Sequence, residues 1–152
     1  MIDYNKIYLV SFSVACALKN WLQYSEETLY HYIDDGNEQR LVSFGSPKKS
    51  LKVKNYETYT APTQGYLMRE LRDKYKILVV AEPIKTIVGN NKTSVIRYVY
   101  SIFDLDESRG RDWKIFDMIE DKDNYFLTQE DAMDAGLLRA LDILKTRGVV
   151  WD

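Results

Sequence analysis

Residues 124–144 constrain the fold of this chain more than any other stretch, because they predict an apolar edge that leads at once into a capped amphipathic helix. Thr128 can accept a hydrogen bond from the first turn through its side-chain oxygen. The three residues after it add acceptors and negative charge where the helix dipole favours them. The pattern therefore predicts a final helix from residue 129 to about residue 145, ending near Gly148.

One face of this helix combines apolar side chains with a glycine. Gly136 in a helix interior costs roughly 1 kcal/mol relative to alanine, and it stands beside Ala140 on the apolar face. Close approach of the helix backbone to a sheet explains its use. Leu138 falls on the opposite, polar side, where it is either a lone surface residue or a contact for a protein partner. The apolar face comprises Ala132, Met133, Gly136, Leu137, Ala140, Ile143 and Leu144.

The composition is typical of a soluble globular protein: 45% of the 152 residues are hydrophobic and 29% are charged. We expect one domain over residues 1–152, which is long enough to bury a core. The net charge of −2 excludes a strong overall field toward nucleic acid or acidic membranes. The 12 tyrosines favour β structure first and a binding surface second. One cysteine excludes an intramolecular disulfide, and the absence of a signal-peptide or membrane-span pattern predicts a cytoplasmic protein.

Two further helices and several strands are expected. Ser11 or Ser13 can cap a helix that runs to about Leu22, and residues 60–63 open a second helix with Pro62 in its first turn. Alternation predicts strands at residues 28–33, 40–44, 76–81, 93–103 and 113–119.

The predicted strands are separated by turn and loop signals. Residues 45–50 are expected to form a loop, Pro83 to end regular pairing, and Gly89-Asn90-Asn91 to form a hairpin turn. Helices outside a strand-rich middle predict the α+β class. We expect a single domain with a mainly antiparallel sheet, built around residues 93–103 and 113–119, and about three helices packed mostly on one face.

Three segments carry a resemblance: VSFSVACALK at residues 10–19, APTQ at 61–64 leading into Leu71-Arg72, and YFLTQEDAMDAGLLRAL at 125–141. Together they resemble a family of small uncharacterised proteins encoded by phages and prophages of Bacteroidales-type gut bacteria. The resemblance implies a phage or mobile-element setting, hence the host cell cytoplasm. It implies no catalytic residues, because that family has no assigned activity.

Residues capable of chemistry are sparse. His31 is the single histidine and falls on a predicted strand, where a structural or surface role is expected. A dyad with Cys16 has no motif to support it. One histidine and one cysteine leave no ordinary zinc ligand set. Residues 104–123 are acidic but lack the spacing of an EF-hand, so we expect a solvated turn. The alternative is a metal-dependent hydrolase or nuclease that uses these acidic residues.

Charge is segregated along the chain. Residues 40–54 hold five basic and no acidic residues, whereas residues 104–134 hold eleven acidic and four basic ones. Tyrosines at 56 and 59 follow the basic stretch, and this combination suits nucleic-acid contact. The simpler interpretation is a solvated loop. The candidate nucleic-acid-binding residues are Arg40, Lys48, Lys49, Lys52, Lys54 and Tyr56.

These observations favour a protein that binds another protein, or a copy of itself, and performs no catalysis. Abundant tyrosine and split charge are both typical of interfaces. We expect no metal, no small-molecule cofactor and no membrane association. Nucleic-acid binding through residues 40–59 is the first alternative, and the metal-dependent enzyme is the second.

Overall fold

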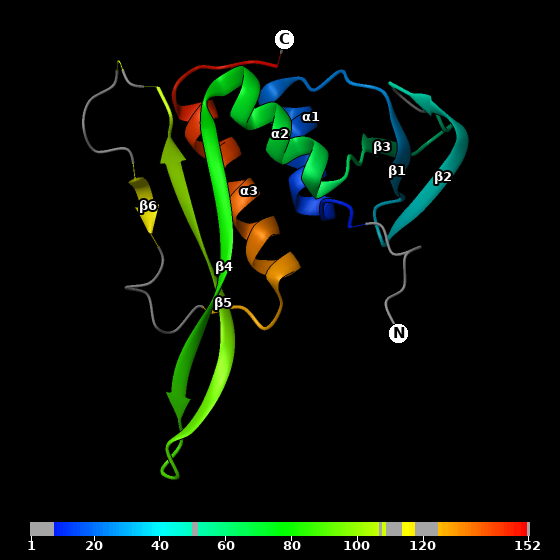
Figure 1. The fold of residues 1–152 in the computed structure, drawn as a ribbon. Coiled ribbons are helices and arrows are strands. Elements are labelled where there is room, and N and C mark those ends of the chain that lie inside the picture. The colour runs from blue at the N-terminus through cyan, green and yellow to red at the C-terminus, as the bar shows by residue number, and fades with distance from the viewer. Residues whose placement is uncertain (1–7, 50–51, 107, 109–113, 118–124, 152) are drawn as a thin grey trace. The chain divides into compact units, whose positions relative to one another are not determined.

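The computed structural model describes residues 8–49, 52–106, 108, 114–117 and 125–151. Within them it contains three helices and two antiparallel three-stranded sheets, which confirms the α+β class (Figure 1). The strands divide between two sheets and do not form the one expected. The chain also separates into two compact units, residues 1–67 with 141–152 and residues 68–140. The single domain therefore stays a prediction, and each unit is described by itself.

The first unit contains α1 (Phe12–Leu22), β1 (Thr28–Asp34), β2 (Gln39–Lys48) and β3 (Glu57–Thr60), with strand order β2-β1-β3. The predicted cap is confirmed, because Ser11 Oγ accepts from the Val14 amide at 3.3 Å.

The end of the chain is fixed to this unit. The Trp151 amide donates to the Leu22 carbonyl at 2.6 Å, and the Trp151 ring lies 4.9 Å from the Tyr24 ring. On α1 itself Trp21 is only half-buried; the buried residues of that helix are Val14, Ala15, Ala17, Leu18 and Leu22.

The second unit is built on a long hairpin of β4 (Ile77–Val88) and β5 (Thr93–Asp104), joined by the predicted turn at residues 89–92. Short β6 (Lys114–Asp117) pairs with β5, giving the order β4-β5-β6. Helices α2 (Gln64–Tyr75) and α3 (Gln129–Thr146) each cross the boundary between the two units.

Gly136 explains how α3 meets this sheet. A Cβ atom at Gly136 would lie 2.6 Å from Val79 Cγ1 and 3.1 Å from Tyr100 Cβ. The first distance is shorter than side chains tolerate and the second is tight, so glycine permits this approach without displacing Val79 or Tyr100. The predicted contact between helix backbone and sheet is confirmed.

Three predictions that rested on proline or glycine residues are wrong. Pro83 does not end β4, because it lies on an edge strand with its nitrogen directed away from β5. Residues 45–48 are not loop: β2 continues through Gly45 and Pro47 beside a register irregularity opposite Leu29, where the ladder is already interrupted. Pro62 precedes α2 and is not in its first turn. The residue that caps the helix is Thr63, whose Oγ1 accepts a hydrogen bond from the Tyr66 amide at 3.1 Å.

Candidate functional site: the hairpin arm

The outer half of the β4–β5 hairpin forms an arm, defined here as residues 83–98. Its strands pair in continuous register from Pro83 opposite Tyr98 to Val88 opposite Thr93. Within the second unit, the arm continues beyond the N-terminal end of α3 (Figure 1). Gln129, the first residue of α3, reaches the sheet at the base of the arm, where its side chain donates to the Ala81 carbonyl at 3.3 Å.

The arm carries an apolar face that continues the helix-covered face of the sheet. Residues directly opposite in an antiparallel pair share a face, as do residues two apart on a strand. Val79 and Tyr100, which Gly136 contacts, therefore share a face with Ile87 and Ile96. On the arm nothing among the described residues covers that face, so Ile87 is 69% exposed and Ile96 56% exposed. They are diagonal neighbours, because Ile87 is opposite Ser94.

Both edges of the arm are protected against pairing with another strand. Tyr98 exchanges two backbone hydrogen bonds with Phe126, at 2.8 and 2.9 Å, so its opposite residue Pro83 directs its nitrogen outward and offers no donor. On the β5 side, the Arg97 guanidinium donates to the Ile96 carbonyl at 3.1 Å. Proline and charged side chains on edges disfavour strand addition. At these two positions the edges of the arm are unsuited to strand addition.

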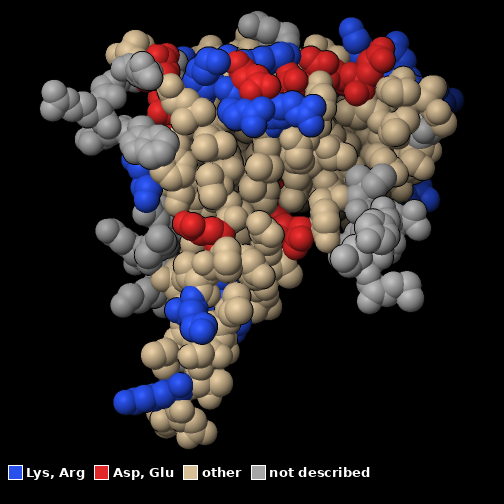
Figure 2. All heavy atoms as spheres, viewed as in Figure 1, with Lys and Arg blue, Asp and Glu red and all other residues tan. Residues whose placement is uncertain are grey.

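The charge of the arm has one sign. Residues 83–98 contain Lys85, Lys92 and Arg97 and no acidic residue. Figure 2 shows basic side chains along the arm in this view and acidic ones only at its base. The arm thus combines exposed isoleucines with positive charge, which suits an apolar surface bordered by carboxylates.

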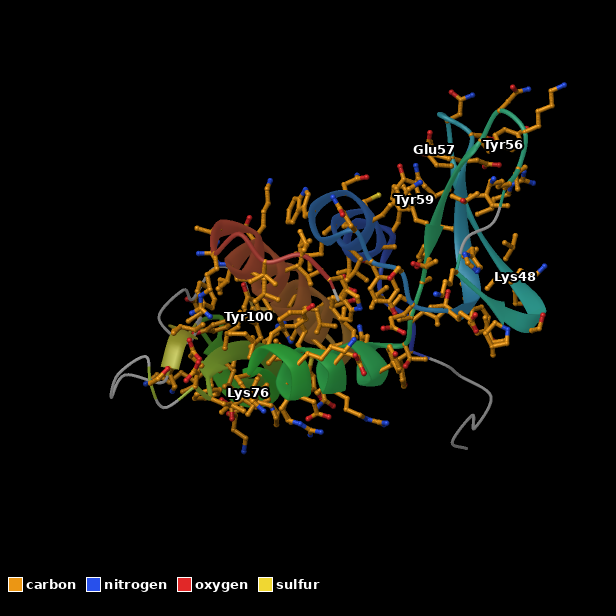
Figure 3. The ribbon with its side chains drawn as sticks, turned by 90° about the horizontal axis from the view of Figure 1, so that it is seen from above. Lys48, Tyr56, Glu57, Tyr59, Lys76 and Tyr100 are labelled. Atoms are coloured by element: carbon orange, nitrogen blue, oxygen red, sulfur yellow. The ribbon has the colours of Figure 1, made fainter. Side chains whose placement is uncertain are left out.

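The candidate nucleic-acid-binding residues are all exposed but do not form one cluster. Lys48 pairs with Thr28 at the start of β1, whereas Glu57, next to Tyr56, pairs with Asp34 at the end of β1. That separation is about 20 Å at the rise of a strand, and Figure 3 shows Lys48 and Tyr56 well apart. Arg40, opposite Ile33, lies at the Tyr56 end, together with Lys54 in the turn before it; Lys49 follows Lys48 at the other end.

His31 and Cys16 do not act on each other in any described contact. His31 is fully buried in β1, and its Nε2 lies 3.2 Å from the Thr28 carbonyl oxygen. Burial raises the pKa of the Cys16 thiol, and the negative charge of Asp34 raises it further. A thiol of raised pKa is protonated and a poor nucleophile. The structure therefore supports the expected structural role for His31.

The acidic segment is engaged in turns where it is described. Asp104 accepts from the Asp106 amide at 3.0 Å, and Asp106 accepts from the amide and hydroxyl of Ser108. Asp104 is buried and not solvated as expected. Among the described residues, no three histidine, cysteine or carboxylate side chains are placed to hold a metal. Residues 107, 109–113 and 118–123 of the proposed enzyme site lie outside the described residues.

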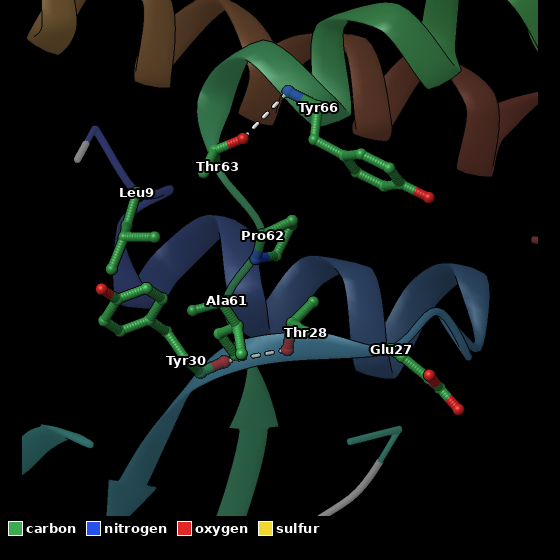
Figure 4. A pocket seen from close by; sticks show the side chains of 9 residues that line it. Leu9, Glu27, Thr28, Tyr30, Ala61, Pro62, Thr63 and Tyr66 are labelled. Carbon is green, nitrogen blue, oxygen red and sulfur yellow. Dashed lines mark hydrogen bonds between the residues drawn. The ribbon is translucent and has the colours of Figure 1, made fainter. Parts of the chain in front are cut away.

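A small apolar cavity lies in the first unit (Figure 4). Its volume is about 210 Å³. Leu9 and Tyr30 form one side, Tyr66 the other, and Pro62 lies between them. Two of its hydroxyls serve the backbone: Thr63 caps α2, and Thr28 donates to the Tyr30 carbonyl at 2.9 Å. The remaining lining residues are Glu27, Leu29 and Ala61.

Sequence reasoning did not single out Ile87 and Ile96. Ile96 fell on the predicted strand 93–103, but no strand was predicted at Ile87, because Pro83 was expected to end regular pairing. Leu138, the residue proposed for an interface, is half-buried in α3.

Comparison with known proteins finds no family model, no curated protein and no solved structure that matches this chain. The phage setting expected from the resemblance stays a prediction. In the described part of the chain, no helix is long and apolar enough to cross a membrane.

Proposed function

We propose that this protein acts by binding another protein through the apolar face of the arm, without catalysis. The observation that carries the proposal is the exposure of Ile87 and Ile96 on a face that α3 covers only at its inner half. Burying an isoleucine side chain stabilises a complex by about 1.5–3 kcal/mol. Two neighbouring isoleucines on one face of a paired ribbon are suited to serve as an interface centre.

The partner should present an apolar groove bordered by acidic side chains. Lys85, opposite Ile96, shares the face of the isoleucines, and Lys92 lies in the turn beside them, so these two lysines would meet those carboxylates. Arg97 lies on the other face. A second copy of this chain is one protein that offers acidic residues, since eleven of them lie in residues 104–134. Self-association is therefore one form that the proposed binding can take.

The test compares two variants that replace exposed apolar residues. Ile87→Ser with Ile96→Ser removes the arm's apolar face, whereas Leu41→Ser removes a 46% exposed leucine on β2. Capture from extracts of the source cells and analytical ultracentrifugation would measure partner binding and self-association. We expect the arm variant to lose at least tenfold in affinity, which corresponds to about 1.4 kcal/mol, while Leu41→Ser binds as the original chain does.

Two results would overturn the proposal. One is a partner that binds the arm variant as tightly as the original chain. The other is a strictly monomeric protein that captures nothing above background at any concentration tested. Circular dichroism and thermal unfolding must show that the arm variant keeps its fold, which is expected because both isoleucines are exposed.

Nucleic-acid binding through residues 40–59 is the second candidate function. Arg40, Lys54 and Tyr56 favour it, because all three are exposed at the same end of the β1–β2–β3 sheet. Binding to phosphates should weaken steeply with salt, since each neutralised phosphate releases counterions. A mobility-shift assay would compare Arg40→Glu with Lys54→Glu against Lys48→Glu with Lys49→Glu. Loss of nucleic-acid binding in the Arg40→Glu, Lys54→Glu variant alone supports binding at the Tyr56 end of the sheet. Equal mobility shifts for both variants and the original chain contradict it.

A further inference from the structure

A second, polar cavity in the first unit has the composition of an anion site. Its volume is about 130 Å³. Every lining residue carries a polar group and none is a carboxylate: Lys19, Tyr24, His31, Lys49, Thr58 and Thr60. The basic stretch of the sequence contributes only Lys49, so the fold and not sequence proximity assembles this cavity.

The polar wall comes from β1, β3 and the segment between α1 and β1. His31 is opposite Thr60 in the β1–β3 register, and Thr58 lies two residues earlier on the same face of β3. His31 is fully buried, and Tyr24 and Thr60 are each 8% exposed. Backbone contacts with Thr28 hold the imidazole in place. These side chains are consequently fixed before any ligand arrives.

Two lysines line the cavity, and because Glu57 pairs with one of them, one net positive charge remains. The Lys19 ammonium donates to Glu57 Oε2 at 3.1 Å and to the Thr58 carbonyl at 2.8 Å, which accounts for two of its three N–H groups. Glu57 is thereby neutralised by Lys19, and Lys49 adds a second ammonium. Burial lowers the pKa of His31, so the imidazole is neutral at pH 7.

We propose that this cavity binds one small tetrahedral oxyanion of the phosphate class. Its volume matches that of about four water molecules, taking roughly 30 Å³ for each. That is room for a phosphate group, and any sugar or base attached to it would lie outside the cavity. Lys19 and Lys49 would supply charge-assisted hydrogen bonds, and the hydroxyls of Thr58 and Thr60 would complete the shell.

The single histidine makes the proposal testable at one position. NMR spectra of the imidazole would be recorded while inorganic phosphate is added, with chloride at matched ionic strength as the control. We expect a saturable change of the His31 ring signals with phosphate and none with chloride. Lys49→Ala should weaken binding by tenfold or more, the loss for one charge-assisted hydrogen bond. Lys52→Ala, which removes a neighbouring exposed lysine outside the cavity, should bind as the original chain does.

A short single-stranded oligonucleotide, titrated in the same way, identifies the source of the phosphate group. If the oligonucleotide saturates the His31 signal at a lower concentration than inorganic phosphate does, and the Lys49→Ala variant loses this response, the site binds a nucleic-acid phosphate. Saturation by inorganic phosphate alone assigns it to the free anion. A His31 signal that responds to neither inorganic phosphate nor the oligonucleotide would overturn the proposal. An equal response in the Lys49→Ala and Lys52→Ala variants would also overturn it. Thr60→Val keeps the volume of the side chain and gives a second, charge-independent check, with an expected loss of binding.

Discussion

The inner half of the β4–β5 hairpin has a helix against one face and β6 paired along β5, whereas among the described residues the outer half has neither. On the face of the inner half that α3 covers, Val79 and Ile102 are at most 2% exposed. At the outer half Ile87 and Ile96 are more than half exposed, although the strands and the register continue unchanged. The same alternating pattern thus produces a core surface in one place and an exposed apolar surface in the other.

The limit between the two halves is set by where α3 begins. Thr128 caps the helix, and Gln129 tethers its first turn to Ala81. Beyond that point no element of the second unit, among the described residues, supplies apolar atoms to the sheet face. A strand pair of this kind is marginal unless another surface covers its face, which is why the arm is best understood with a partner.

The largest expected effect contrasts an isoleucine in each half. Ile102→Ala removes a fully buried side chain and should lower the free energy of unfolding by about 2–5 kcal/mol. Ile96→Ala removes an exposed one and should change it by no more than about 0.5 kcal/mol. Urea unfolding measures both. Similar losses for the two variants would mean that the arm face is covered within the free protein.

A smaller effect is expected from two glycines in helices. Gly136→Ala places a methyl group against Val79 and Tyr100 and should destabilise by about 1–3 kcal/mol, despite the better helix propensity of alanine. Gly65→Ala in α2 meets open space and should stabilise by roughly 0.5–1 kcal/mol. Thermal unfolding measures whether each substitution raises or lowers the melting temperature. A stabilising Gly136→Ala would show that α3 does not lie close against the sheet.

The smallest expected effect concerns the cap that ends the covered half. Thr128 Oγ1 accepts from the Asp131 amide at 3.1 Å, so Thr128→Ala should cost about 1 kcal/mol and loosen the first turn of α3. Hydrogen exchange should speed up at Asp131 and remain slow at Leu141 in the buried part of the helix. Ser13→Ala, an exposed serine within α1, serves as the control and should leave exchange unchanged.

Much of the fold was predictable from local patterns. The caps at Ser11 and Thr128, the turn after Gly89 and the long strand after it all follow from residues near in sequence, and the structure confirms them. The failures at Gly45, Pro62 and Pro83 share a cause. Each prediction used only the backbone preference of the residue itself. Whether a strand or helix accepts that residue depends on its edge position, the strand register or the capping residue next to it.

The candidate sites were much less predictable. The stretch of residues 40–54 looked like one basic patch, but β2 carries Arg40 and Lys48 to opposite ends of the sheet. Conversely, Lys19, His31 and Lys49 are far apart in sequence and line one cavity. Strand pairing decides which distant residues meet, and the sequence pattern of a single strand does not contain that information.

The sequence by itself determined the fold class, the helix that Thr128 begins and the close approach that Gly136 requires. These features depend on hydrogen bonds, helix periodicity and side-chain volume within a few residues of chain. Only the tertiary structure decided that the strands form two sheets and that α3 covers half of a hairpin face. Ile87 and Ile96 carry the same side chain as an isoleucine buried in the core. Their exposure depends on what lies opposite, and that is a property of packing and not of the residues themselves.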